Sequence, residues 1–242
     1  MMNFRQALDA HFPGTISEAD FVRSSYDALN VHGFNEENTI ACVGVCRDEM
    51  TRSLVDSIQK TWGEAFNFSS LGGMLFLGKT GFFAAHHHAP VDGGRERYAY
   101  FAMAHIAIDE AGRIGVCHRP GRPGSSGACG ALIAFRQEML DGRLNLALDL
   151  DDIEQSLLKH RLFRKIRYGD LPDLVALTKI AYEVILEDLG HLVELTVDTA
   201  VSDYALLCGI QIHGPDKQLV VWPGAMYVVI NGQRDELVLR DT

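Results

Sequence analysis

The sequence has no long apolar run and no surplus of positive charge. No stretch approaches the roughly 20 apolar residues that a helix needs to cross a bilayer. The first residues, MMNFRQALDAHF, lack the basic-then-apolar pattern of a secretory signal. Because the formal net charge is −10, the composition also argues against a nucleic-acid partner. We therefore expect a cytoplasmic protein that binds neither membrane nor nucleic acid.

Cysteine is scarce, and its five positions form no disulfide pattern. An odd count in a chain without a signal does not indicate a disulfide framework. Cys42 and Cys208 lie in apolar runs and are expected to be buried small hydrophobes. Cys46, Cys117 and Cys129 lie beside glycine, proline or charge, which fits simple packing less well.

The rest of the composition is typical of a soluble globular protein. The chain has 242 residues, of which 47% are hydrophobic and 22% charged. We expect a single domain over residues 1–242, with helices at 4–33, a core segment at 38–140, and helices and strands at 150–240. The predicted architecture is a mainly parallel central sheet flanked by helices, with antiparallel strands added near the C-terminus.

Three apolar segments predict the central strands. Residues 38–46, NTIACVGVC, are β-branched and apolar, as in a strand buried on both faces. Residues 71–83 predict a second strand, followed by a loop with three histidines, and residues 95–109 contain a third. A helix is expected over 129–142, and another over 171–190 that ends at glycine.

Cys46, His105 and Cys129 are the candidate metal ligands. Cys46 follows a strand, His105 lies within one, and Cys129 opens a helix, where the helix dipole favours a thiolate. Two thiolates, one imidazole and an open fourth position make a plausible catalytic zinc site. The spacing alone is unspecific, because the chain has neither a CxxC nor an HExxH motif.

At these residues the chain resembles a known family. The segments VCRDEMTR, LGKTGFFAAHHHAP and HIAIDEAGRIGVCHRPGRPGSSGACGAL are similar to the limiting-CO2-inducible protein B (LCIB) family, which includes theta-class carbonic anhydrases. The resemblance covers roughly residues 30 to 230. It implies a fold and a site like those of β-carbonic anhydrases, with Zn²⁺ on Cys, His and Cys in a homodimer.

The first half of the β-class pattern, CxDxR, is matched in part. Cys46 and Asp48 fit it, but Met50 stands where the pattern has arginine. Arg52 or Arg47 must then take the role of that arginine, and Arg52 is the choice made here.

The second half, HxxCG, is matched only at Cys129 and the glycine after it, because Ser126 stands where the pattern has histidine. His105 is our choice for the missing ligand, since its distance from the first cysteine resembles that of the β class. His88 and His118 stay open as alternatives.

The resemblance also implies a mechanism. Zinc-bound hydroxide attacks CO2 to give bicarbonate, and a new water is then deprotonated. Asp48 would accept a hydrogen bond from the zinc-bound water, held in a bidentate pair with Arg52. His88 is the candidate proton shuttle, with His86 and His87 beside it.

Other interpretations of the same residues remain open. Asp48 can be a helix N-cap without any catalytic role. Within the family, Asp48 can also occupy the fourth zinc position, which would make the protein a catalytically silent binding or assembly partner in carbon handling. A different zinc hydrolase, acting on an ester, amide or amidine, and a redox-active thiol protein are further alternatives.

Overall fold

The computed structural model describes residues 2–119, 121 and 123–239. The strands are β1 (Ile16–Ser17), β2 (Thr39–Gly44), β3 (Ala65–Asn67), β4 (Val91–Asp92), β5 (Arg95–Ala107), β6 (Val116–Cys117), β7 (Ser126–Gly127), β8 (Ser202–His213), β9 (Leu219–Ile230) and β10 (Gln233–Glu236). The helices are α1 (Phe4–His11), α2 (Glu18–Val31), α3 (Arg52–Trp62), α4 (Gly78–His86), α5 (Gly130–Leu140), α6 (Ile153–Phe163) and α7 (Leu174–Thr196), with the 3-10 turns η1 (Glu49–Thr51), η2 (Leu71–Gly73) and η3 (Pro215–Lys217).

One mixed sheet forms the centre of the molecule. Its strands lie in the order β1-β9-β8-β5-β2-β3, and β10 and β4 pair with β9 and β5. The pairs β3–β2, β2–β5 and β5–β8 are parallel, whereas β9 is antiparallel to its three neighbours β8, β1 and β10. The predicted fold class is therefore confirmed: a mainly parallel sheet with antiparallel strands near the C-terminus.

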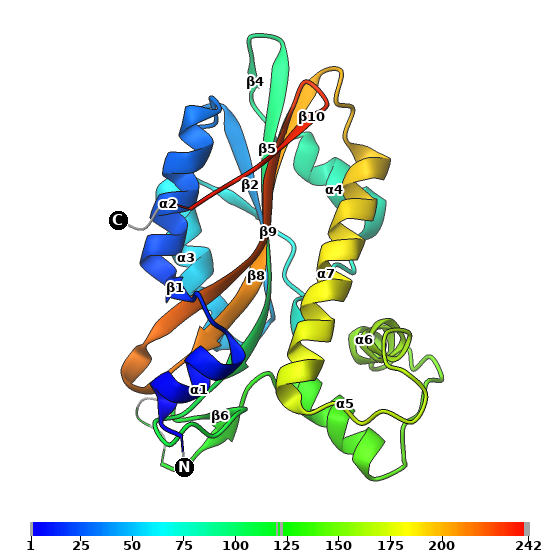
Figure 1. Ribbon diagram of the computed structural model, residues 1–242. Coiled ribbons are helices and arrows are strands. Elements are labelled where there is room, and N and C mark those ends of the chain that lie inside the picture. The colour runs from blue at the N-terminus through cyan, green and yellow to red at the C-terminus, as the bar shows by residue number, and fades with distance from the viewer. Residues whose placement is uncertain (1, 120, 122, 240–242) are drawn as a thin grey trace.

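Helices cover both faces of this sheet. Figure 1 shows α2 and α3 on one face, and α4 and α7 on the other. The first face packs Phe21, Leu54, Ile58 and Trp62 against β2 and β5, all at most 1% exposed. Truncating a buried aromatic side chain such as Trp62 costs roughly 3–5 kcal/mol, so this layer contributes to the stability of the fold.

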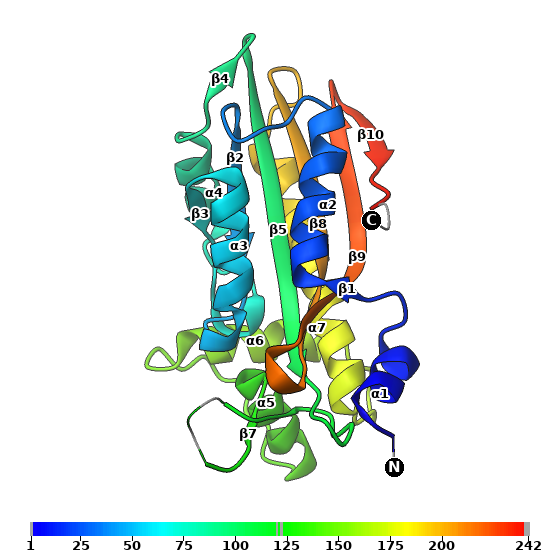
Figure 2. The same cartoon turned by 90° about the vertical axis from the view of Figure 1, so that its left-hand side faces the viewer.

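The lengths of the strands leave an open end to the sheet. β5 and β8 are 13 and 12 residues long, but β2 has only six and β3 three. Figure 2 shows β5 running past the end of β2 towards α5 and the small β6–β7 sheet. The last residues of β5 are thereby left beside the loop that follows β2.

The prediction of a strand over residues 71–83 is wrong. This segment forms η2 and α4, and the second parallel strand is the shorter β3. Gly73 has a φ of +78°, and a Cβ there would lie 2.4 Å from the carbonyl oxygen of Met103 in β5. The chain therefore passes directly over β5, which only glycine permits, instead of running beside β2.

α7 continues past Gly190, where we expected it to end, and reaches Thr196. Leu189 and Val193 are each 1% exposed, so the turns on both sides of the glycine are buried against the core. That burial outweighs the cost of glycine within a helix, about 1 kcal/mol. Among the helices of residues 2–119, 121 and 123–239, none combines the length and apolar character needed to cross a membrane.

Candidate metal centre

Cys46 lies two residues beyond β2, at the open end of the sheet. The backbone N–H of Ser70 donates to the Val45 carbonyl at 3.1 Å, which extends the strand pairing up to the cysteine. The Thr51 hydroxyl donates to the Cys46 carbonyl at 2.8 Å and to that of Asp48 at 2.9 Å. The turn after β2 is thus fixed on both sides of the thiol.

The end of β5 brings His105 and Cys129 together. The backbone N–H of Ala107 donates to the Ala128 carbonyl at 3.2 Å, which ties the end of β5 to the residue before Cys129. Cys129 is the N-cap residue of α5, in extended conformation. His105 lies two residues before Ala107, so one strand end positions both side chains.

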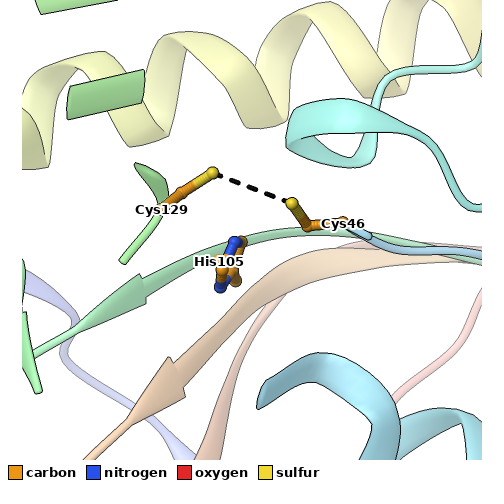
Figure 3. A group of neighbouring side chains, drawn as sticks. All are labelled: Cys46, His105 and Cys129. Carbon is orange, nitrogen blue, oxygen red and sulfur yellow. Dashed lines mark hydrogen bonds between the residues drawn. The ribbon is translucent and has the colours of Figure 1, made fainter. Parts of the chain in front are cut away.

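The three predicted ligands form one cluster. Their donor atoms all lie within 4.8 Å of one another, and the sulfur atoms of Cys46 and Cys129 are 3.8 Å apart. Figure 3 shows the two sulfurs pointing toward each other, with His105 on β5 beside them. Two sulfurs bound to one tetrahedral zinc at about 2.3 Å also lie about 3.8 Å apart. The cluster therefore has the spacing of a zinc site.

The imidazole of His105 supplies the third donor of the candidate zinc site. Its Nδ1 lies 3.1 Å from Nε2 of His213, while its Nε2 has no hydrogen-bond partner among the described residues. The side chain is 1% exposed, and a buried nitrogen without a partner is costly. A metal ion is the partner that two neighbouring thiols and a free ring nitrogen suit best.

The two thiols differ in acidity, in the opposite sense to our expectation. Hydrogen bonding to Cys129, helped by His105, lowers the pKa of Cys46 to about 4, although burial opposes this. The same contact with Cys46, together with burial, raises the pKa of Cys129 well above its usual range. The position of Cys129 at a helix N-terminus is outweighed by its neighbour, and the first thiolate forms at Cys46.

Asp48 is held by Arg119, a residue that we did not assign to this role. The Arg119 Nη2 atom lies 3.3 and 3.4 Å from the two carboxylate oxygens of Asp48. Arg119 also donates to Glu49 at 2.5 Å and to the Ser126 hydroxyl. It thereby joins the loop of Cys46 to the loop of Cys129. Asp48 is also the N-cap of η1, accepting from the Met50 N–H at 3.1 Å, and burial raises its pKa.

The two arginines proposed for Asp48 pair with other carboxylates. Arg52, our first choice, is 77% exposed and pairs with Asp56 at 3.3 Å, one turn along α3. Arg47 binds Glu154 of α6 through two nitrogens, the shorter contact being 2.6 Å. The pairing expected between Arg52 and Asp48 is therefore not formed, because successive turns of α3 bring Arg52 to Asp56.

The other candidate histidines lie outside the donor cluster. His88 follows α4, is exposed, and its ring centroid is 5.8 Å from that of Phe66. His118 is exposed and is hydrogen-bonded to the Gly124 carbonyl at 3.2 Å. Of the three histidines considered as ligands, only His105 joins Cys46 and Cys129. Whether His88 carries protons stays a prediction.

A surface hollow of about 560 Å³ borders the cluster at Cys46. Cys46, Asp48, Arg47 and Arg52 are among its lining residues. Cys46 is 4% exposed, whereas His105 and Cys129 are each 1% exposed. A molecule in the hollow would therefore lie next to Cys46, with Asp48 beside it.

Sequence reasoning missed Arg119 and His213. Arg119 could have been considered, since it is one of two arginines in the basic loop shortly before Cys129. The β-class pattern, however, has its arginine two residues after the aspartate, which favours Arg52 and Arg47. His213 had no local signal. It lies in a strand far from the other residues, and only the pairing of β5 with β8 places it beside His105.

Together, the fold and the site define an α/β protein with a thiol–imidazole–thiol cluster at the carboxyl end of a parallel sheet. Comparison with known families identifies the class more narrowly. The chain belongs to the family described as limiting CO2-inducible proteins B/C beta carbonic anhydrases, whose model matches residues 15–230. Among proteins of curated function, none matches this chain.

Solved structures agree with this assignment. The crystal structure of limiting CO2-inducible protein LCIB is 36% identical, with a TM-score of 0.81, and covers 98% of this chain and 100% of its own. The structure of PtLCIB4, a homolog of LCIB, has a TM-score of 0.83 at 23% identity, covering 96% of this chain and 98% of its own. At that identity the second likeness concerns the fold alone.

Proposed function

We propose that this protein is a zinc-dependent carbonic anhydrase that hydrates CO2 reversibly to bicarbonate. The observation that carries the proposal is the 3.8 Å separation of the Cys46 and Cys129 sulfurs beside an imidazole nitrogen without a partner. Membership of a family described as beta carbonic anhydrases supports the choice of reaction.

Cys46, His105 and Cys129 would hold the zinc ion, which leaves one position of a tetrahedral site open. When bound, zinc supplies Lewis-acid activation of water at neutral pH. The lowered pKa of Cys46 favours the thiolate that a metal requires, and Nε2 of His105 has no competing hydrogen-bond partner among the described residues.

Asp48 would orient the attacking water by accepting its hydrogen bond. Its carboxylate is 13% exposed and lies at the hollow beside Cys46. Arg119 contacts both carboxylate oxygens, and the Met50 N–H occupies one of them as well. These contacts favour an open fourth metal position over the alternative in which Asp48 closes the site.

The small exposure of the donors suits a small neutral substrate such as CO2. The hollow in front of them is nevertheless much larger than CO2, and this feature favours a second candidate, hydrolysis of an ester, amide or amidine. The same residues would serve both reactions, so only assays with each substrate class separate them.

The proposal is tested by measuring zinc content and the CO2 hydration rate on one purified sample, by elemental analysis and stopped-flow indicator assay. We expect about one zinc per chain and hydration well above the uncatalysed rate. Zinc without hydration would favour the catalytically silent relative, and a folded protein that takes up no zinc would overturn the proposal. The expected homodimer stays a prediction, which sedimentation velocity checks.

A further inference from the structure

His213 is a buried histidine next to the metal centre. It is the last residue of β8, is 1% exposed, and is paired in register with Ala107 of β5. His105 is paired with Gln211, so both histidines project from the same face of neighbouring parallel strands. Their ring planes meet at 79°, with the His105 Nδ1 and His213 Nε2 atoms 3.1 Å apart.

Two ring nitrogens at this distance share one proton, and its location decides whether His105 can bind a metal. If His213 donates, Nδ1 of neutral His105 is the acceptor and its Nε2 carries the hydrogen. That Nε2 then has no electron pair for a metal ion. If His105 donates from Nδ1, its Nε2 is an unprotonated nitrogen among the donors of the cluster.

We propose that His213 is a positioning residue for the metal centre: its Nε2 accepts the Nδ1–H of His105 and fixes the metal-binding tautomer and ring orientation of that ligand. The inference rests on the proposed function, because it assumes that His105 binds zinc. It extends that function by naming a residue outside the ligand set on which zinc affinity depends.

A role in packing alone explains a histidine at position 213 less well than the proposed role does. Its Nδ1 has no hydrogen-bond partner within residues 2–119, 121 and 123–239, although the side chain is almost fully buried. An apolar residue of similar size would avoid the cost of that buried nitrogen. Within the described residues, the contact with His105 is the one hydrogen bond of the His213 side chain.

Two substitutions of His213 whose side-chain amides differ in length provide the test. The amide of His213→Gln extends to the position of the ring Nε2 and can accept from His105, whereas that of His213→Asn ends near the position of Nδ1. His213→Leu removes the acceptor entirely. As a control, Ile212→Val changes a neighbouring and equally buried residue of β8 without touching the histidine pair.

The readout is zinc affinity, measured at pH 7 by competition with a chromophoric chelator, alongside the thermal midpoint of the metal-free protein. We expect His213→Leu and His213→Asn to weaken zinc binding about 10- to 100-fold, and His213→Gln to restore most of the loss. Ile212→Val should lower the thermal midpoint without changing zinc affinity.

Equal zinc affinity in wild type, His213→Asn and His213→Leu would overturn the inference while leaving the proposed function intact. Equal weakening by Gln and Asn would also overturn it, since the effect would then not depend on an acceptor at the Nε2 position. Absence of zinc binding by the wild-type protein would instead refute the proposed function. If His213→Leu does not fold, the comparison of Gln with Asn still decides the question.

Discussion

Two buried histidines at β5, one packed against the strand and one within it, have different surroundings. His86, in α4, is hydrogen-bonded through Nε2 to the Tyr100 hydroxyl at 2.6 Å and stacks on Tyr98 with centroids 4.2 Å apart. His105 has one nitrogen on His213 and the other without a partner, beside two thiols. Both are at most 9% exposed, so burial alone does not distinguish them.

The difference between the two lies in what surrounds the ring. Around His86 the neighbours are aromatic, and burial lowers its pKa to about 4, as expected for a neutral core histidine. Around His105 the neighbours are soft donors arranged at zinc spacing. A buried histidine is therefore a candidate ligand when a free nitrogen and additional donors coincide, and the following variants test that distinction.

Removing one ligand should have the largest effect. Cys46→Ala is expected to lose zinc and to reduce CO2 hydration by more than the 10- to 100-fold typical of losing an outer partner of a metal ligand. Elemental analysis and stopped-flow hydration on the same sample measure both. Cys42→Ala is the matched control, because Cys42 is a buried thiol of β2 whose pKa burial raises. Equal zinc content in the two variants would contradict the assignment of Cys46.

Loss of the arginine beside Asp48 should have an intermediate effect. Arg119→Gln is expected to retain zinc but to slow hydration about 10-fold, because Asp48 is no longer held from both oxygens. Arg52→Gln should change the rate less than about twofold, as its exposed ion pair with Asp56 contributes little. The CO2 hydration rates of the two variants show which arginine supports Asp48. A slower rate for Arg52→Gln than for Arg119→Gln would favour the role predicted for Arg52 from the sequence.

Changes at His86 should affect stability and leave zinc unaltered. His86→Phe keeps the aromatic packing but leaves the buried Tyr100 hydroxyl without its partner, which costs about 1–3 kcal/mol. Urea denaturation gives the free energy of unfolding, and elemental analysis gives the zinc content. A variant that folds normally yet loses zinc would show that His86 belongs to the metal centre after all.

The smallest effect concerns pH. The pKa of His86 is lowered from 6.5 to about 4, so between these values the unfolded chain binds the proton that the folded protein resists. The stability due to neutral His86 is thus fully present above pH 6.5 and is lost as pH falls towards 4. The stability advantage of wild type over His86→Phe should shrink from pH 7 to pH 5 in urea titrations; a growing advantage would contradict the burial argument.

Much of the fold followed from local patterns, and the site only in part. The apolar run before Cys46 predicted β2 correctly, because a strand buried on both faces has a distinctive composition. Residues 71–83 look equally apolar, yet their glycines allow the passage over β5 that makes the segment a turn and a helix. Local composition does not record such a close approach.

Cys46 and Cys129 could be named as proposed ligands because they lie next to a strand end and a helix start, and His105 because its distance from Cys46 resembles that of the β class. The residues that contact Asp48 and His105 from other segments could not be named from the sequence. Arg119 reaches Asp48 from a different loop, and His213 reaches His105 from the neighbouring strand β8. Contacts between segments distant in the sequence depend on register and loop conformation, neither of which any single segment encodes.

The central claim is that Cys46, His105 and Cys129 bind one zinc ion together. X-ray absorption spectroscopy at the zinc edge, on the purified and dialysed protein, tests it most directly. We predict two sulfur ligands at about 2.3 Å and nitrogen or oxygen ligands at about 2.0–2.1 Å. A shell of nitrogen and oxygen alone, or no zinc above background, would contradict the claim.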